Sequence, residues 1–230
     1  MKPLASNFSR LRCAVRPCLA LTLASLAALA GMPALAKTEH FSLDPVHTRI
    51  AFQISHAGFS NPVGTFAGTI GSLDFDQHDW SSATLDVRIP IASLNLGDSN
   101  WQKKILDRTF FDAGKFPQAH FRSTGIQSTG PKTARVTGEL TLHGVTRPVT
   151  LDATLNALGR HPLTLRRTIG FSATASLSRK DFGMDAWKSL IGDEVRLIIE
   201  VEAERAHAND TPDPEHPAPA VEDAVDANAQ

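Results

Sequence analysis

The strongest constraint on this chain is an alternation of apolar and polar residues that recurs through most of its length. Ile50, Phe52 and Ile54 are apolar, and their neighbours are largely polar. A period of two is typical of a strand with one buried and one solvated face. Turn-forming residues at 58–62 interrupt the pattern, and it resumes at 63–75. The region therefore predicts a long, bent hairpin of two strands.

The same alternation predicts the rest of the domain to be strands. It recurs at 84–91, 120–126, 135–142, 149–156, 163–177 and 195–204. Short links such as His143-Gly144 suit hairpins. We expect an all-β fold of about eight strands, in an antiparallel sheet that closes into a barrel or folds into a sandwich.

Two segments break the alternation. Residues 99–111 are expected to form a helix, because Ser99 and Gln102 have the spacing of a capping box and Trp101 lies on one face with Ile105. Residues 181–193 are expected to form a loop with one helical turn at 187–191.

The first 36 residues have the features of a secretory signal peptide. A basic start precedes the apolar run Leu19 to Ala30, and Ala34-Leu35-Ala36 forms a cleavage site. The alternative is an uncleaved membrane anchor, for which the run is short. We expect a periplasmic or secreted protein, with no stable membrane insertion after cleavage near Ala36.

Removal of this segment leaves a mature chain without cysteine, because Cys13 and Cys18 both lie in it. The remainder divides into a domain at 37–205 and a tail at 206–230. The tail has six acidic residues, four prolines and neither Lys nor Arg, which predicts disorder. The charge of the domain is nearly balanced, so nucleic-acid binding has no electrostatic basis.

The residues give no positive sign of catalysis or of metal binding. Asp44 and His47 have a spacing that a Ser-His-Asp site would allow, but no G-x-S-x-G context accompanies them. The histidines lack zinc spacing, and Gly-rich phosphate loops are absent from the sequence. We expect no enzyme activity, no metal and no resident cofactor. His56 shares the parity of Ile54, so we expect it to point inward, with a core role favoured over a role in orienting a ligand.

An eight-stranded barrel either fills its interior with side chains or holds one small ligand. Small residues on the apolar faces would leave space: Gly68, Gly138, Ala153, Ala173 and Ala175. Aromatic residues outside the strands would line or lid the mouth, or else plug the barrel as ordinary core. Both interpretations stay open at this point.

Several motifs resemble the YceI family of lipid- or polyisoprenoid-binding proteins, across roughly Phe41 to Ala203. They include Leu43-Asp44-Pro45-Val46-His47-Thr48, Phe110-Phe111-Asp112, Gly138-Glu139-Leu140-Thr141-Leu142-His143-Gly144 and Ser178-Arg179-Lys180-Asp181-Phe182-Gly183-Met184. The order and spacing of the motifs, rather than any single one, carry the resemblance.

The resemblance implies a lipocalin-like, eight-stranded antiparallel barrel with one helix and a short helical loop. It implies an elongated apolar interior for an isoprenoid quinone, a polyprenyl phosphate or another long amphiphile. Relatives are commonly dimeric, so the oligomeric state stays open between a monomer and a homodimer. The segment Trp101-Gln102-Lys103-Lys104-Ile105 departs from the Arg-Asp-x-His-Leu of many relatives. Either Lys103 and Lys104 meet an anionic head group, or they are a solvated surface pair.

Parity and location give the residues that we expect to contact a ligand. The predicted lining is Phe52, Ile54, Phe66, Ile89, Leu140, Phe171 and Ile199. The predicted mouth is Trp101, Phe110, Phe111, Phe182 and Trp187, with His56 as a minor candidate for the polar end. We expect a carrier that shields a long lipid from water. The alternatives are a stress- or redox-linked accessory protein without cargo, and a secreted hydrolase.

Overall fold

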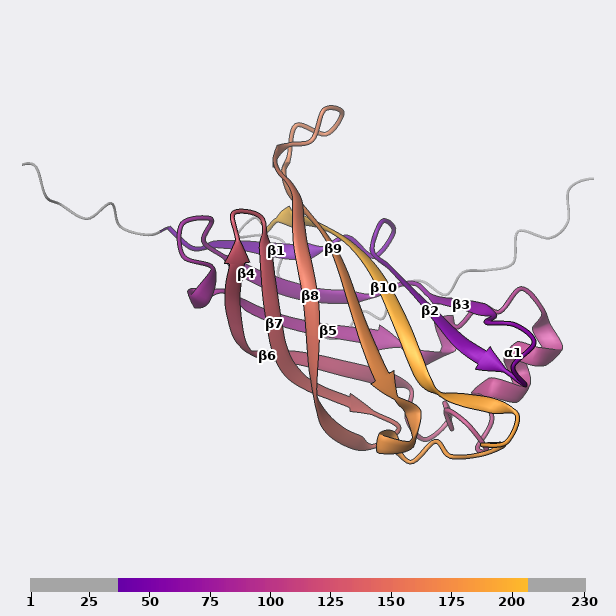
Figure 1. Ribbon diagram of the computed structural model, residues 1–230. Helices are drawn as coiled ribbons and strands as arrows, with labels where there is room; N and C mark the ends of the chain where they lie inside the picture. The colour runs from indigo at the N-terminus through magenta and orange to yellow at the C-terminus, as the bar shows by residue number, and fades with distance from the viewer. Residues whose placement is uncertain (1–36, 207–230) are drawn as a thin grey trace, which may run out of the picture. The chain divides into compact units, whose positions relative to one another are not determined.

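The structure is a computed structural model that describes residues 37–206, which form one antiparallel sheet with a single α-helix (Figure 1). The expected signal peptide and nearly all of the expected tail lie outside the described residues. The strands are β1 (Glu39–Leu43), β2 (Arg49–His56), β3 (Val63–Phe66), β4 (Ile70–Phe75), β5 (Thr84–Pro90), β6 (Gln118–Gly130), β7 (Thr133–Leu142), β8 (Val145–Arg160), β9 (Arg167–Ser178) and β10 (Ile191–Arg205). Within 37–206, no helix has the length and apolar character needed to cross a membrane.

Eight of the strands close into a barrel, which confirms the predicted fold class. Their order is β1-β4-β5-β6-β7-β8-β9-β10, and β1 closes the ring by pairing with β10. Phe41 of β1 lies opposite Leu73 on one side and opposite Arg205 on the other. The first part of β10 pairs instead with β2, and β3 pairs with β2. The strands β2 and β3 therefore extend the wall at one end of the barrel.

The predicted strand at 63–75 is two strands, because the chain turns at residues 67–69. Gly68 there has φ 63°, a conformation that glycine adopts without strain. One edge of β3 pairs with β2, and its other edge lies against the segment that follows β5. Thr65 and Asn95 exchange backbone hydrogen bonds of 2.9 and 2.8 Å, and the Ala67 N–H donates to Ser93 Oγ at 3.1 Å. These three bonds complete the wall beside β3.

The predicted strand that starts at Leu163 begins only at Arg167. Residues 161–166 form a turn that projects from the end of β8 and β9 (Figure 1), where Leu163 is 87 % exposed. The Leu165 N–H donates to the His161 carbonyl at 2.9 Å, and Leu165 has φ 57°. This tight turn overrides the apparent alternation of the leucines.

The helix α1 (Ser99–Leu106) is shorter than the predicted 99–111, and its cap is one residue earlier than predicted. Asp98 Oδ1 accepts from the Trp101 N–H at 2.7 Å, which is N-capping by an aspartate rather than by Ser99. The loop between β9 and β10 begins with a 3-10 helix, η4 (Arg179–Phe182). The expected turn follows, with the Leu190 and Ile191 N–H groups donating to the Trp187 carbonyl at 2.8 and 2.9 Å.

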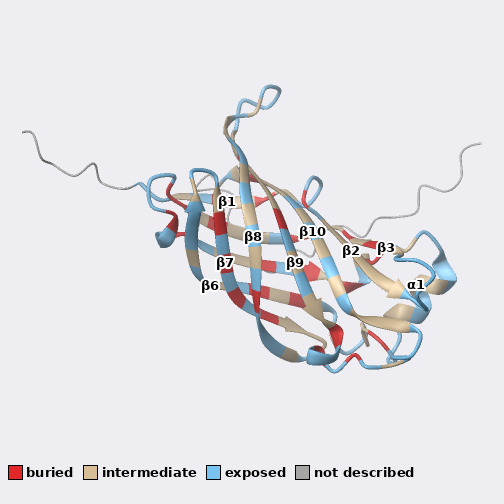
Figure 2. Ribbon diagram, in the orientation of Figure 1, coloured by how far each residue is buried: buried red, intermediate tan, exposed pale blue. Residues whose placement is uncertain are grey.

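Buried residues recur along the strands of the barrel (Figure 2), and aromatic side chains of the core fill the end away from α1. Phe75, Trp80 and Phe171 pack edge to face there, with ring centroids 5.2 to 6.2 Å apart. Gly138 leaves no space in the barrel, because a Cβ there would lie 2.4 Å from the Phe121 ring, which occupies that position. One half of the barrel is therefore plugged, but by Phe75, Trp80 and Phe171, and not by the aromatic residues of the helix and the 181–193 loop that the sequence offered for a plug.

Candidate functional site: an apolar cavity in the barrel

The half of the barrel beside α1 encloses a cavity of about 710 Å³. Its wall comes from β2, β3, β5, β6, β7, β9 and β10, from α1, and from the segments that follow β2, β5, α1 and β9. The wall is almost wholly apolar, and its few polar or charged residues are Ser55, His56, Ser60, Lys104 and Arg179. Known ligand pockets have volumes of roughly 300–1,000 Å³ and are lined in this way.

Eleven of the thirteen predicted ligand-binding residues lie in the cavity wall. They are Phe52, Ile54, His56, Phe66, Ile89, Trp101, Phe110, Phe111, Leu140, Phe182 and Trp187. Their position is a structural fact, whereas their contact with a ligand stays a prediction.

The structure places Phe171 and Ile199 outside this cavity. Both have the predicted inward parity, but they lie farther along the barrel. Phe171 belongs to the filled end, beside Phe75 and Trp80. Ile199 lies opposite Ala173 and Ile50 in the ladders of β10. Parity gives the face of a strand but not the height of a residue along the axis.

Sequence reasoning missed other parts of the wall. Val195 and Leu197 line the cavity four and two residues before Ile199, and their shared parity was a usable signal. Leu142 likewise lies two residues after Leu140 on β7, and Leu177 lies two residues after Ala175 on β9. Leu96 comes from the irregular segment after β5, for which periodicity offers no signal.

Several of the aromatic rings that line the cavity pack against one another. Phe110 and Trp187 pack edge to face at 5.8 Å between ring centroids, and the His56 and Trp101 rings are 6.4 Å apart. His56 is exposed rather than buried, so the expected core role is wrong. It ends β2 at the rim, where the strand leaves the barrel.

Arg179 is the more buried of the two charged residues in the cavity wall, Lys104 and Arg179, with 5 % of its surface exposed. Its guanidinium donates to the carbonyls of Met184, Ile191 and Gly192 at 2.6, 3.1 and 2.8 Å. Burial lowers the pKa of Arg179, and the charges of Asp193 and Asp185 act against that shift. Since Met184 and Ile191 flank the loop 185–190, the arginine holds this loop against the cavity.

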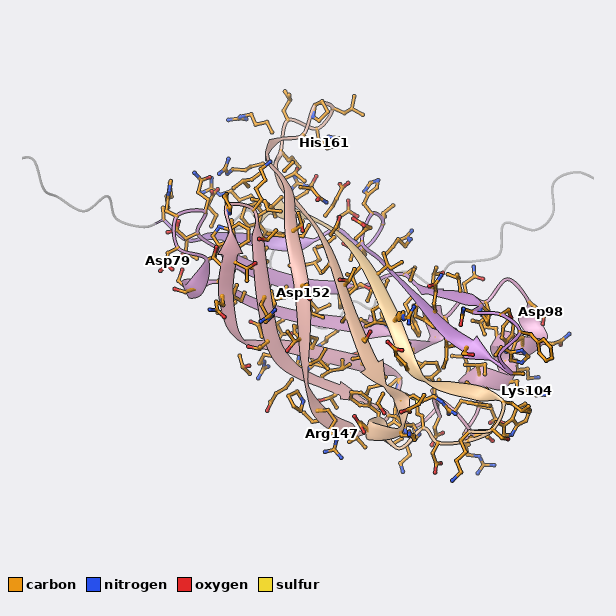
Figure 3. The ribbon with its side chains drawn as sticks, in the orientation of Figure 1. Asp79, Asp98, Lys104, Arg147, Asp152 and His161 are labelled. Atoms are coloured by element: carbon orange, nitrogen blue, oxygen red, sulfur yellow. The ribbon has the colours of Figure 1, made fainter. Side chains whose placement is uncertain are left out.

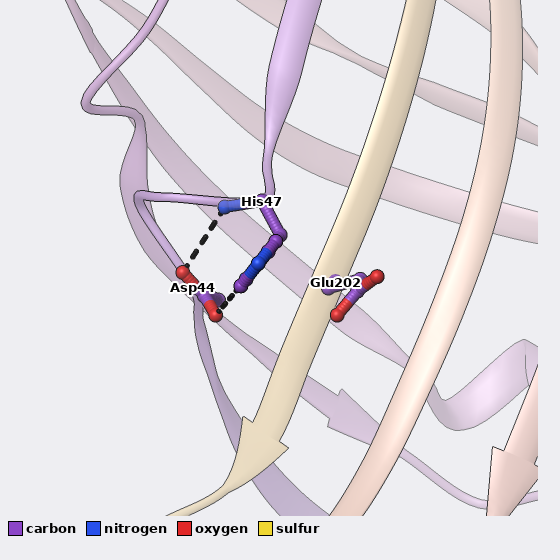
Figure 4. Close-up of side chains that lie close together, drawn as sticks. All are labelled: Asp44, His47 and Glu202. Atoms are coloured by element: carbon purple, nitrogen blue, oxygen red, sulfur yellow. Dashed lines mark hydrogen bonds and ion pairs between the residues drawn. The ribbon is translucent and has the colours of Figure 1, made fainter. Parts of the chain in front are cut away.

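A second cluster, Asp44, His47 and Glu202, lies outside the barrel (Figure 4). One possible ligand atom from each lies within 4.8 Å of the others. Asp44 is already engaged, because its carboxylate accepts from the Val46 and His47 N–H groups and lies 2.7 Å from His47 Nδ1. This hydrogen bond raises the pKa of His47. Burial raises the pKa of Asp44, but its hydrogen bonds outweigh that and lower it. The cluster locks the turn between β1 and β2.

Comparison with known proteins agrees with this architecture. The YceI-like domain family matches residues 41–203. A UPF0312 protein of Pseudomonas savastanoi is 40 % identical over 167 residues, which are 70 % of this chain and 86 % of that protein. A UPF0312 protein of Pseudomonas fluorescens is 37 % identical over 194 residues, which are 79 % and 98 % of the two chains.

Solved structures with the same fold include BcnA of Burkholderia cenocepacia, at a TM-score of 0.63 and 24 % identity over 70 % of this chain and 98 % of that one. The YceI protein of Campylobacter jejuni gives a TM-score of 0.59 at 29 % identity, over 65 % and 88 % of the two chains. A polyisoprenoid binding domain from Saccharophagus degradans gives 0.57 at 16 % identity, over 74 % and 100 %. The barrel, its cavity and the match over residues 41–203 together show that this chain belongs to the YceI-like domain family.

Proposed function

We propose that this protein is a periplasmic carrier that holds the long apolar chain of an isoprenoid, such as an isoprenoid quinone or a polyprenyl phosphate, inside its barrel. The observation that carries the proposal is the apolar cavity of about 710 Å³ in the half of the barrel beside α1. The polyisoprenoid binding named for the structural relative from Saccharophagus degradans supports the same ligand class.

The energetics favour an extended hydrocarbon as the cargo. Each buried methylene contributes about 0.8 kcal/mol, so a five-carbon unit contributes roughly 4 kcal/mol before the ordering of the chain is subtracted. The wall has few polar groups to recognise a polar molecule, and Lys104 lies near the mouth. We therefore expect affinity to come from the tail, while the head stays near Lys104 and His56.

The proposal includes no catalytic step and no metal. His47 is bonded to Asp44, but among residues 37–206 no serine hydroxyl donates to its ring. The expected signal peptide is the basis for proposing a periplasmic location.

The test is native mass spectrometry of the protein purified from the periplasm of its own source, followed by organic extraction. We expect one bound molecule per barrel, released as an isoprenoid or another long-chain lipid. Protein that is free of lipid, and that takes up no ubiquinone on incubation, would overturn the proposal. Fractionation of the cells tests the location, and a cytoplasmic protein with its first 36 residues intact would contradict it.

A further inference from the structure

The rim of the cavity carries three large apolar side chains that stay largely exposed. Phe59, in the turn between β2 and β3, is 93 % exposed. Trp187 and Leu190, in the loop before β10, are 50 % and 49 % exposed. Apolar side chains gathered in this way mark a surface that meets an apolar partner.

These side chains lie beside the opening of the cavity. The turn and the loop are joined by a hydrogen bond of 2.5 Å from the Ala57 N–H to the Leu190 carbonyl. Ser60 and Pro62 from the turn, and Trp187 from the loop, are themselves part of the cavity wall. The turn that carries Phe59 and the loop that carries Leu190 therefore border the cavity together.

Exposed lysines accompany the apolar side chains. Lys103 and Lys104 lie on α1, which contains no acidic residue, and Lys188 follows Trp187. The Lys104 ammonium is 5.1 Å from the centroid of the Trp187 ring (its position at the α1 end is seen in Figure 3). None of the three lysines makes an ion pair within residues 37–206, although Asp98 and Asp107 flank α1 and Asp185 lies on the same loop as Lys188. Tryptophan beside lysine is typical of protein surfaces that lie at phospholipid head groups.

We propose that this rim docks on a bilayer that contains anionic phospholipid, so that the cavity opens towards the lipid phase. The proposal rests on the carrier function, since an apolar cargo is what such docking would load or deliver. A bilayer fits better than a second copy of the chain: a two-fold contact through this rim would bring the lysines of both copies together. Anionic head groups neutralise these lysines, while Phe59 and Leu190 enter the acyl boundary.

The test is flotation of the protein with vesicles of phosphatidylcholine, with or without phosphatidylglycerol. We expect docking on the anionic vesicles that weakens with salt. Phe59→Ser should lower the partition coefficient about tenfold or more, and Lys188→Ala about fivefold. The matched control is Leu163→Ser, because Leu163 is 87 % exposed on the turn at the other end of β9. Its partition coefficient should stay that of the unaltered protein.

Equal docking by Phe59→Ser and the unaltered protein, or an equal loss in Leu163→Ser, would overturn the proposal. So would a dimer in analytical ultracentrifugation that Phe59→Ser abolishes, because a second copy would then occupy the rim. Neither Phe59 nor Lys188 lines the cavity, so quenching of tryptophan fluorescence by a short-chain ubiquinone should be the same in both variants. Docking without any ubiquinone binding would overturn the carrier function and leave the docking surface standing.

Discussion

Replacement of Arg179 by methionine tests whether this one side chain holds the loop over the cavity. The change removes three hydrogen bonds, to the carbonyls of Met184, Ile191 and Gly192 at 2.6, 3.1 and 2.8 Å. A hydrogen bond with a charged donor contributes roughly 1.5–3 kcal/mol. Methionine also removes the desolvation of a buried cation, which offsets part of the loss. We expect the free energy of unfolding to fall by about 2–4 kcal/mol.

The loss should be concentrated in the loop. The amide of Met184 donates to the Arg179 carbonyl, and those of Leu190 and Ile191 donate to the Trp187 carbonyl. All three bonds depend on the loop staying against the barrel, so their hydrogen exchange should accelerate more than that of β7 and β8. A loosened loop also frees Trp187 and Met184 from the cavity wall, so cargo should dissociate faster.

Urea denaturation followed by circular dichroism gives the free energy, and hydrogen exchange with mass spectrometry locates the change. The matched control is Arg147→Met, because Arg147 is an exposed arginine whose guanidinium donates only to the carbonyls of Asp181 at 3.1 Å and of its neighbour Thr146 at 3.5 Å. It should change the stability by less than about 0.5 kcal/mol. The reasoning is refuted if Arg179→Met is as stable as Arg147→Met and exchange at 184–191 is unchanged.

Two further predictions follow from other parts of the barrel. Leu197→Trp puts a larger side chain into the cavity wall, so it should weaken the binding of a short-chain ubiquinone at least about tenfold. The overpacking should also lower the free energy of unfolding by about 1–3 kcal/mol. Phe171→Ala, in the filled end, should instead lower the free energy of unfolding by about 3 kcal/mol and leave the ubiquinone affinity unchanged. Similar ubiquinone affinities in the two variants would contradict the division of the barrel into a cavity half and a filled half. The hydrogen bond from Arg167 lowers the pKa of Glu39 below its ordinary value of 4.5, against the effect of burial. A lowered carboxyl pKa stabilises the fold above the unfolded pKa, and the benefit is lost as the pH falls through the folded one. Glu39→Gln should therefore be less stable at pH 7 and should lose less stability on acidification below about pH 4.5, and parallel acid-denaturation curves would argue against it.

The side of each strand that faces inward was predictable, because a period of two relates sequence directly to the two faces of a sheet. Phe52, Ile54, Ile89 and Leu140 lie in the cavity wall for this reason. The position along the barrel axis was not predictable in the same way. It depends on the register between strands, and the register placed Phe171 in the filled end.

Contacts between segments account for the remaining differences. Arg179 was visible in the sequence only as part of a motif, since its role depends on three carbonyls supplied by residues that follow it by 5 to 13 positions. The division of 63–75 into two strands reflects their different partners, since β3 pairs with β2 whereas β4 pairs with β1 and β5. Propensity and periodicity are local properties and carry no such information.

The wall beside β3 has a different construction from the rest of the circumference. Elsewhere neighbouring strands are joined by ladders, of which the shortest has three residue pairs between β1 and β10. Beside β3, continuity depends on the paired bonds of Thr65 with Asn95 and on one bond from Ala67 to Ser93. Lateral parting of the barrel at this seam disrupts three hydrogen bonds, while parting between β9 and β10 disrupts a ladder that spans eleven residue pairs. Thermal breathing of the wall should accordingly begin at the seam, which gives a bulky chain a sideways route that does not require end-on threading.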